Sequence, residues 1–569
     1  MNKDASSLWR YFFVVFVLIA ATVCLFWRLI DLNILQRGFL LQQSNARILR
    51  TVSIPTYRGM ITDRYLQPLA ISAQVDSIWV NPQLFEPTSL QIEQLAQLLK
   101  LPPQKIFVKT QKKSGKEFVY LKRGVAPAAS EKIVSLKIAG VFCQHNYHRF
   151  YPQSEVAAHV IGFTNVDDQG QEGLELTYDT WLRGIPGKKK VIKDRPGNII
   201  TELGVIQAPR QGHNLILSLD NRIQYLAHET LRESIEKFSA KSGSIVVLDI
   251  TTGEVLAMVN QPTFNPNHIE KMGDGRYRNR AMTDMFEPGS TMKAFSIASA
   301  LESGKYNLNS VIDTAPGWLN VNGNVIRDEH NCGVLNLVKI LQKSSDVGVA
   351  KITLSLPPEH FIELLRRVGF GERTNSAFPG EAAGTLSLRT KWRPFELATL
   401  SFGYGISVTT IQLAKAYAII ADHGLERPIS LLKVDKVPAG RQVLERKIAE
   451  QMITMLEAVV QGGTGSLAKV PGFRVAGKTG TANIAGKNGY DKQHYVSSFV
   501  GIAPVSNPRL VVAVVIKDPR GEQHLGGMVA APIFSKVMSG ALRLMNVAPD
   551  DLTNESENAA IDSGEDGEN

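Results

Sequence analysis

A serine followed three residues later by a lysine is the pattern in this sequence best suited to nucleophilic chemistry. It occurs four times, at Ser234/Lys237, Ser290/Lys293, Ser430/Lys433 and Ser466/Lys469. Only Ser290 follows a Pro-Gly turn and begins an apolar helical run, which predicts a hydroxyl at a helix N-terminus, where free N–H groups favour negative charge. Lys293 then lies one turn further along the same face. We therefore expect Ser290 to be the nucleophile and Lys293 its catalytic partner.

A serine hydroxyl must lose its proton to attack, and a lysine accepts a proton only when it is neutral. Burial and a second nearby cation both lower the pKa of a lysine. Lys478 is predicted to be that second cation, and the Ser344 hydroxyl is predicted to relay the proton.

The residues after Lys478 are candidates for substrate binding. Thr479 and Thr481 offer hydroxyl groups that, with Lys478, can hold a carboxylate. Gly480 lies between them at the end of a predicted strand, where the absence of a side chain lets a substrate backbone approach.

Other chemistries fit the sequence less well. Residues 472–479 match the G-x-x-x-x-G-K-T pattern of a phosphate-binding loop, but the polar, glycine-containing stretch that follows does not predict the helix which that loop requires. Cys24, Cys143 and Cys332 are too far apart for zinc-finger spacing. No aromatic-interleaved basic motif accompanies the net charge of +10, so nucleic acid is not an expected partner.

The elements that position these residues are predicted from periodicity. We expect strands at residues 244–249, 254–260, 473–478, 495–503 and 509–517, and helices through residues 291–301, 334–354 and 412–422. Strands thus lie at both ends of a helical middle, which indicates an α/β class with mixed α+β character and a sheet shared by the two ends.

A membrane anchor is predicted at residues 9–30. The 17 uncharged residues between Arg10 and Arg28 span about 26 Å as a helix, close to the hydrocarbon thickness of a bilayer. A cleaved signal peptide is the alternative, but no A-x-A-like cleavage site follows.

The rest of the chain has globular composition, with 44% hydrophobic and 20% charged residues. The predicted organisation is a cytoplasmic N-terminus at residues 1–8, the anchor, a pedestal at 31–235, a catalytic domain at 236–548 and a disordered acidic tail at 549–569. The lysines at positions 188, 189, 190 and 193 are predicted to lie in a solvated loop.

Three ordered segments resemble the signature of penicillin-binding proteins and serine β-lactamases. They are Ser290-Thr291-Met292-Lys293, Ser344-Ser345-Asp346 and Lys478-Thr479-Gly480-Thr481. Residues 58–64 (RGMITDR), 149–152, 158–162, 401–405, 501–504 and 518–519 resemble class B penicillin-binding proteins, the last three in particular the division-specific FtsI type. The resemblance extends from the anchor to about residue 553.

The resemblance implies a septal peptidoglycan D,D-transpeptidase, anchored in the inner membrane by one helix, with its bulk in the periplasm. Ser290 would attack the penultimate D-Ala carbonyl of a donor stem peptide and release D-Ala. The acceptor amine of diaminopimelate would then resolve the acyl-enzyme. β-Lactams would be covalent inhibitors, and no metal or cofactor is implied.

The resemblance also assigns roles and partners. The backbone N–H groups of Ser290 and Thr481 would form the oxyanion hole, and Lys293 would be the base. Ser344 and Lys478 would pass the proton to the leaving amine. Expected division partners are an FtsW-type glycosyltransferase, an FtsQ/FtsL/FtsB-type complex and an FtsN-type activator.

The second segment departs from the family pattern, because Asp346 stands where an asparagine is usual. We count Asp346 among the substrate-binding candidates, but an ionised carboxylate only accepts hydrogen bonds. Near Lys293 it would favour the charged lysine, unless it is turned away or protonated. Three alternatives therefore accompany the septal transpeptidase: an elongation-specific class B enzyme, a serine β-lactamase, and a catalytically weak division scaffold.

Overall fold

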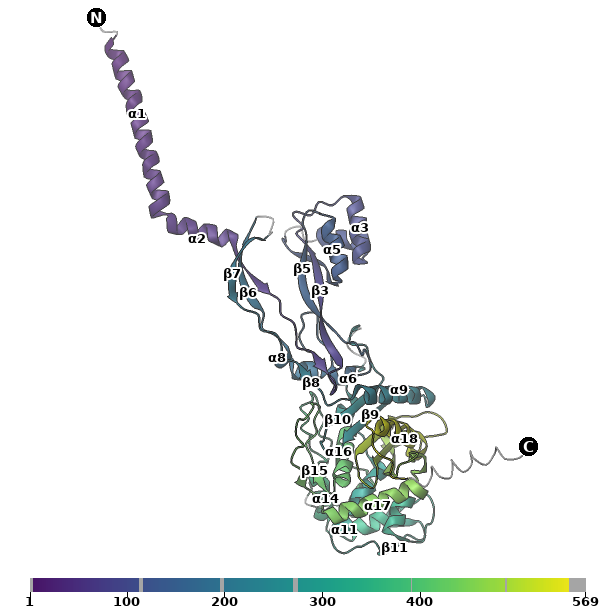
Figure 1. Ribbon diagram of the computed structural model, residues 1–569. Helices are drawn as coiled ribbons and strands as arrows, with labels where there is room; N and C mark the ends of the chain where they lie inside the picture. Colours follow the sequence, from purple (N-terminus) through teal and green to yellow (C-terminus); the bar gives the residue numbers. More distant parts are fainter. Residues whose placement is uncertain are drawn as a thin grey trace, which may run out of the picture. The chain divides into compact units, whose positions relative to one another are not determined.

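The computed structural model describes residues 4–111, 116–194, 199–269, 275–389, 391–486 and 489–551 (Figure 1). The chain divides into two compact units. The first takes the residues up to Tyr57 together with Ala73–His148 and Gly184–Gly212, and the second takes Arg58–Ser72, Arg149–Arg183 and the residues from His213 onward.

The first unit begins with the long apolar helix α1, Asp4–Ile30 (Figure 1). The stretch Leu8–Leu35 is long and apolar enough to cross a membrane, and none of its most apolar window is buried in the protein. A π-helical turn, Asp31–Leu35, leads into α2, Arg37–Ile48. This arrangement fits a single membrane anchor at the N-terminus.

A small antiparallel sheet of order β1-β6-β7 also belongs to the first unit. Its strands are β1 (Leu49–Ile54), β6 (Gly187–Lys193) and β7 (Ile199–Gln207). The predicted lysine loop is therefore wrong, because Lys188, Lys189 and Lys190 lie on the central strand. Val191 is fully buried in this strand, and Lys189 forms an ion pair with Glu202 of β7, so the strand accommodates the charges.

The remainder of the first unit packs helices against strands. The helices are α3 (Ser89–Leu99), α4 (Pro103–Gln111) and α5 (Pro127–Ser135), and the strands are β3 (Pro68–Val80), β4 (Val119–Val125) and β5 (Val141–Phe150). Their core contains Ile78, Leu95, Ile106, Leu121 and Ile133.

The second unit starts with short elements held by buried charges. These elements are β2 (Ile61–Thr62), α6 (Ala158–Ile161), α7 (Gly173–Thr177), α8 (Asp179–Leu182) and β8 (Leu215–Ile216). Glu175 accepts a 2.6 Å bond from Arg58 Nε and another from Arg149 Nε, and Arg58 Nη1 lies 2.7 Å from Asp179 Oδ1. The two arginines belong to the segments that resemble the family, and the Arg58–Glu175 pair joins positions 117 residues apart in the chain.

The centre of the second unit is an antiparallel sheet of order β10-β9-β19-β18-β17. The strands are β9 (Ser242–Asp249), β10 (Val255–Gln261), β17 (Ala476–Gly486), β18 (Gly489–Ala503) and β19 (Leu510–Lys517). The predicted pairing of the two ends of the domain is confirmed, because β9 lies beside β19 with Val246 opposite Ala513.

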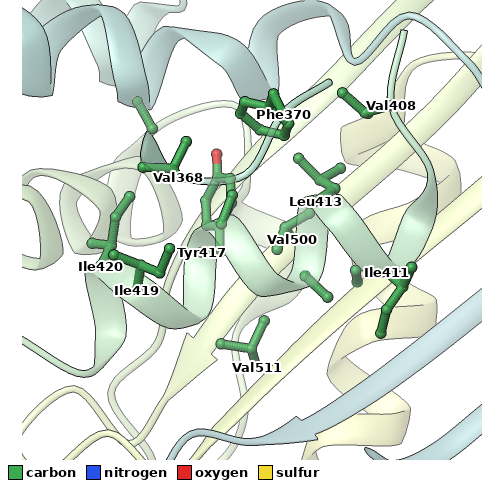
Figure 2. Close-up of a cluster of buried hydrophobic side chains, with 14 of the residues drawn as sticks. Val368, Phe370, Val408, Ile411, Leu413, Tyr417, Ile419, Ile420, Val500 and Val511 are labelled. Carbon is green, nitrogen blue, oxygen red and sulfur yellow. The ribbon is translucent and has the colours of Figure 1, made fainter. Parts of the chain in front are cut away.

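Both faces of this sheet are buried, which explains the apolar runs in its strands. Val511 and Ala513 belong to the core that α16 (Thr410–Ala421) covers, whereas Val512 and Val514 face the core under α18 (Gly526–Leu544). Figure 2 shows the first core, with Tyr417 of α16 among apolar side chains that include Val500 and Val511. Helix α9 (Asn221–Lys237) packs on the α18 face.

The remaining elements form the helical middle and its loops. The helices are α10 (Arg280–Thr283), α11 (Lys293–Glu302), α12 (Leu337–Lys343), α13 (Asp346–Leu354), α14 (Pro358–Arg367), α15 (Pro394–Leu400) and α17 (Arg446–Gly462), with 3₁₀ turns η2 (Gly289–Met292) and η3 (Ser466–Ala468). The short strands are β11 (Val311–Asp313), β12 (Trp318–Val321), β13 (Asn324–Arg327), β14 (Val334–Asn336), β15 (Leu425–Glu426) and β16 (Arg441–Gln442).

Two predicted elements differ from the structure. Residues 334–354 were expected to be helical throughout, but they begin with β14, and the helix breaks at Ser344, whose φ of 58° is left-handed. The strand expected to lead into Lys478 begins only at Ala476 and continues to Gly486, so Lys478 lies early in β17 and not at its end. The break at Ser344 has no glycine or proline beside it in the sequence.

The predicted acidic tail lies mostly outside the described residues. Asp550 is held by backbone bonds, because its carboxylate accepts from the N–H groups of Arg474 (2.7 Å) and Ser506 (3.0 Å). The ordered chain therefore extends at least to Asp551, three residues into the predicted tail.

Candidate active site

The turn that carries Ser290 is held in place by a hydrogen bond from a residue of the buried core. Gly289 has a φ of 55°, and the 3₁₀ turn η2 continues directly into α11 at Lys293. The buried hydroxyl of Tyr417 donates a 2.8 Å hydrogen bond to the Thr291 carbonyl. Ser290 itself is half-buried and lines a cleft. A serine in a rigid, partly exposed turn at the start of a helix matches the predicted nucleophile.

Strand β17 packs closely against this turn at Gly480. A Cβ on Gly480 would lie 2.7 Å from the Pro288 carbonyl oxygen and 2.4 Å from Ser498 Oγ. The space beside Gly480 is therefore taken by the protein's own nucleophile turn. Close approach of the turn, rather than the predicted approach of a substrate, is the structural reason for a glycine here.

Ser344 lies at the junction of α12 and α13. Its left-handed backbone ends α12, and its N–H group donates to the carbonyls of Ile340 and Leu341. The next residue, Ser345, caps α13 by accepting a 2.9 Å bond from Gly348 N. This break between two helices directs the Ser344 side chain away from either helix axis and toward the two lysines.

Both lysine side chains meet at the Ser344 hydroxyl. Lys293 Nζ and Lys478 Nζ each lie 3.0 Å from Ser344 Oγ. Lys293 Nζ also donates to the Ser344 carbonyl, while Lys478 Nζ lies 3.2 Å from the Thr479 carbonyl. The structure thus brings together the three groups that the sequence analysis placed in one proton-transfer network.

The electrostatics of Lys478 favour a neutral amine. The side chain is fully buried, and this burial, together with the positive charge of Lys293, lowers the pKa of Lys478 well below its usual value. The Asp346 carboxylate opposes the shift but does not cancel it.

Asp346 faces Lys293 and is not turned away from the site. Its Oδ1 lies 2.6 Å from Lys293 Nζ, and about a third of its side chain is exposed. The pKa of Asp346 is raised above its usual value: burial and the nearby Asp328 carboxylate raise it, and the attraction of Lys293 offsets them only in part. Asp328 is held by Ser345 Oγ (2.5 Å) and Val347 N (2.9 Å), so it is part of the same polar cluster.

The threonines of the third segment are tied to neighbouring loops. Thr479 Oγ1 lies 2.8 Å from Thr464 Oγ1, and Thr481 Oγ1 accepts a 2.9 Å bond from Gly526 N at the start of α18. Both residues line the same cleft as Ser290. Thr479 and Thr481 of β17 therefore line the cleft beside Ser290 with their hydroxyl groups already held in place.

The cleft has a volume of about 430 Å³, which suits a peptide segment or a drug-sized ligand. The predicted site residues that line it are Ser290, Lys293, Ser344, Asp346, Thr479 and Thr481. Lys478 reaches the site from β17 through Ser344. Gly480 lies behind the nucleophile turn, as described above.

Sequence reasoning missed several residues of this cleft. Asp328, Thr464, Tyr495 and His524 line it, and the rings of Tyr495 and His524 stack with centroids 4.1 Å apart. Tyr495 lies within β18 and the other three lie in loops, and none belongs to a recurrent spacing. The register of the sheet places Tyr495 opposite Asn483 on β17, the strand that carries Lys478.

Comparison with known proteins agrees with this geometry. Residues 243–539 match the family model described as the penicillin binding protein transpeptidase domain, and residues 53–217 match the penicillin-binding protein dimerisation domain. The first match alone covers more than half of the chain. The chain belongs to the penicillin-binding protein transpeptidases.

Relatives and solved structures of the family align over most of the chain. A probable peptidoglycan D,D-transpeptidase, PbpC of Pseudomonas aeruginosa, is 40% identical over 96% of this chain and 96% of its own length. FtsI of Escherichia coli K12, a peptidoglycan D,D-transpeptidase, is 39% identical over 98% of this chain and 95% of its own length.

Among solved structures, the transpeptidase domain of Burkholderia pseudomallei penicillin-binding protein 3 is 41% identical. It has a TM-score of 0.55 and covers 59% of this chain and 98% of its own. Penicillin-binding protein 3 of Mycobacterium tuberculosis, complexed with aztreonam, is 26% identical with a TM-score of 0.67 and covers 88% of this chain and 98% of its own.

These findings confirm the predicted family and fold class. The protein is a class B penicillin-binding protein with a mixed α/β fold, a dimerisation domain and a transpeptidase domain whose antiparallel sheet is flanked by helices. It is a serine-type transpeptidase, and peptidoglycan and β-lactams fit its family.

Proposed function

We propose that this protein is the division-specific peptidoglycan D,D-transpeptidase of its cell, anchored by α1 in the inner membrane and acting at the septum. The observation that carries the chemistry is the position of Ser344 Oγ, 3.0 Å from both lysine amines, in the cleft that Ser290 lines. The division role is supported by the 39% identity to FtsI of Escherichia coli over nearly the whole chain.

The reaction starts when Ser290 Oγ attacks the penultimate D-Ala carbonyl of a donor stem peptide. The Oγ–carbon bond forms, the carbonyl electron pair moves to oxygen, and the hydroxyl proton enters the network of Lys293, Ser344 and Lys478. The N–H groups of Ser290 and Thr481 stabilise the oxyanion, a contribution of a few kcal/mol for each donor.

Collapse of the tetrahedral species breaks the carbon–nitrogen bond, and the network returns the proton to the departing D-Ala amine. Thr479 and Thr481 hold the terminal carboxylate of the donor. The amine of an acceptor diaminopimelate then attacks the acyl-enzyme, gives its proton to the same network and releases Ser290. A β-lactam enters by the same first step, but its leaving amine stays attached.

Labelling with a fluorescent penicillin tests the catalytic assignment. The purified protein is expected to form a covalent adduct that maps to the peptide containing Ser290, and Ser290→Ala is expected to remove it. Ser466→Ala, which changes a cleft serine with the same lysine spacing, is expected to keep it. An adduct that persists on the Ser290→Ala protein would refute the nucleophile.

The alternatives differ in measurable ways. A transpeptidase keeps its penicilloyl adduct for hours, whereas a β-lactamase releases it within seconds. Depletion in cells is expected to give filaments, whereas spheres would indicate the elongation-specific class. A Ser290→Ala protein that still supported division would favour a scaffold.

The proposed division partners are an FtsW-type glycosyltransferase, an FtsQ/FtsL/FtsB-type complex and an FtsN-type activator. Their proposal rests on the likeness to FtsI-type proteins alone. Crosslinking of the full-length protein in its membrane tests it, and crosslinks to elongation proteins instead would contradict it.

A further inference from the structure

We propose that Asp346 decides which of the two lysines is the base: it keeps Lys293 as an ammonium ion, so that Lys478 accepts the Ser290 proton through the Ser344 hydroxyl. Asp346 is then a positioning residue, because it acts through Lys293. The inference deepens the proposed function and rests on Ser290 being the nucleophile.

The first observation is the contact environment of the two amines. Both share Ser344 Oγ, and Lys293 also lies 2.6 Å from Asp346 Oδ1, whereas among the described residues Lys478 forms no ion pair and interacts with Asp346 only at longer range. Within the part of the chain that the structure describes, the other hydrogen-bond partners of Lys478 Nζ are the carbonyl and hydroxyl oxygens of Thr479, which carry no formal charge. When two neighbouring amines share one proton, the proton stays on the amine beside the anion.

The second observation is the place of Asp346 in the fold. It is the first residue of α13, where the dipole of a nine-residue helix favours an ionised carboxylate, although Asp328 and Ser345 already accept from the N–H groups of Val347 and Gly348. Its side chain is about one-third exposed to the cleft, so the ionised form keeps some hydration. These features and the Lys293 amine at 2.6 Å oppose the burial that raises the pKa of Asp346, and we take the carboxylate to be charged.

The charged groups around Asp346 come from several elements. They are Lys293 on α11, Lys478 on β17, Asp328 after β13, and the Tyr404 hydroxyl, a group that would be charged only if ionised. With Lys293 and Asp346 both ionised, a neutral Lys478 leaves these two lysines and Asp346 with no net charge. Burial lowers the pKa of Lys478, which agrees with this distribution.

The proposed proton path uses the hydroxyl that the two lysines share, in the cleft that Ser290 also lines. As Ser290 Oγ bonds to the acyl carbon, its proton passes to Ser344 Oγ, and the Ser344 proton passes to Lys478 Nζ. When the carbon–nitrogen bond breaks, Lys478 returns a proton through Ser344 to the leaving amine. Lys293 keeps its three protons throughout and holds Ser344 in place. The usual asparagine at position 346 would leave Lys293 without this constraint.

The first experiment is the pH profile of acylation. The rate constant for labelling by a fluorescent penicillin is measured on the full-length protein in detergent, from about pH 5.5 to 9.5. Asp346→Asn removes the anion that stabilises a second proton on the lysine pair. The acidic limb is therefore expected to move to lower pH by about one unit or more.

Glu329→Gln is the matched control, because Glu329 lines the same cleft and carries the same charge. Its profile is expected to stay within a few tenths of a unit of the parent. An unchanged acidic limb in the Asp346→Asn protein would show that Asp346 is protonated and would overturn the proposal, as would a move to higher pH.

The second experiment separates the two lysines. Arginine does not give up its proton, so Lys478→Arg is expected to slow labelling by about 100-fold or more. In the Asp346→Asn background Lys293 is released and takes over as base, so the double variant is expected to regain at least about 10-fold. A double variant that is no faster than Lys478→Arg would overturn the assignment of Lys478.

The proposed function fails separately from this inference. If the parent protein is not labelled at Ser290, the proposed function itself is wrong. If the parent protein is labelled at Ser290, but the pH profile of acylation and the double variant do not respond as described, Ser290 remains the nucleophile. Only the proposed role of Asp346 is then wrong.

Discussion

The catalytic arrangement depends on single residues in unusual positions. Ser344 takes a left-handed backbone conformation, which costs an ordinary residue about 1–2 kcal/mol, and this conformation brings its hydroxyl within 3.0 Å of both lysines. Tyr417 ties the carbonyl beside the nucleophile to the buried core. Local strain and a buried hydrogen bond thus position groups that periodicity alone does not place.

Tyr417→Phe is expected to lower the free energy of unfolding by about 1–3 kcal/mol, because it leaves the buried Thr291 carbonyl without its donor. The turn that holds Ser290 loses an anchor, so penicillin acylation is expected to slow as well. Denaturant unfolding and labelling kinetics check the two effects. Tyr306→Phe, which removes a hydrogen bond to Ser355 at the surface, is the control and is expected to change neither quantity. Normal acylation by Tyr417→Phe would refute the anchoring role.

His159 links stability to pH. Burial lowers the pKa of His159 from 6.5 to about 4, although its ring nitrogen donates a 2.8 Å hydrogen bond to the Arg276 carbonyl. Below pH 6.5 the unfolded chain binds a proton that the folded chain refuses, so stability falls as pH decreases toward 4.

This single residue is expected to account for up to about 3 kcal/mol of that loss. Urea unfolding of the parent and His159→Gln at several pH values measures it. The variant is expected to show a smaller acid-dependent decrease, and parallel pH curves for the two proteins would contradict the prediction.

At the scale of elements, buried ion pairs join segments that are distant in sequence. The Arg58, Arg149 and Glu175 side chains are almost fully inaccessible to solvent and connect the segment before β2 with β5 and α7. A buried charge that loses its partner destabilises strongly, whereas a surface pair contributes little.

Arg58→Met is therefore expected to cost about 3–5 kcal/mol of folding free energy. Arg183→Met is the matched control, because Arg183 pairs with the same Asp179 but is 46% exposed, and its loss is expected to cost less than about 1 kcal/mol. Thermal and denaturant unfolding check both values. Equal stabilities of the two variants would show that the buried cluster does not hold these elements.

At the scale of the whole molecule, the segment around Asp550 forms hydrogen bonds to two other parts of the transpeptidase unit. Asp550 accepts backbone bonds from Arg474, which precedes β17, and from Ser506, between β18 and β19. Asp550 therefore connects the segment that leads into β17 with the turn between β18 and β19.

Truncation after Ala548 is expected to lower the free energy of unfolding by about 1–3 kcal/mol, because the N–H groups that Asp550 satisfies lose their acceptor. Truncation after Asp551 retains the contacts and is expected to leave the stability unchanged. A comparison of melting temperatures distinguishes the two. Equal losses would show that residues 552–569 contribute to folding.

Many residues of the candidate site were predictable because they lie in short sequence motifs with recognisable spacing. Ser290 and Lys293 follow from helical spacing, and the alternation of apolar residues predicted the sheet that holds Lys478. Asp328 and Tyr417 were not predictable, because they act through long-range packing that leaves no local spacing. The break at Ser344 was missed because a serine, unlike a glycine, does not signal a left-handed backbone.

The pairing of β9 with β19 has a consequence for biosynthesis. Val246 and Ala513 are opposite each other in the centre of the sheet, yet the ribosome makes one of them more than 260 residues before the other. The nascent chain must therefore keep the apolar strand β9 from aggregating until nearly all of the polypeptide has been made. The central sheet can form completely only after β19 has been synthesised. A chaperone that shields β9 during translation would therefore raise the yield of folded protein.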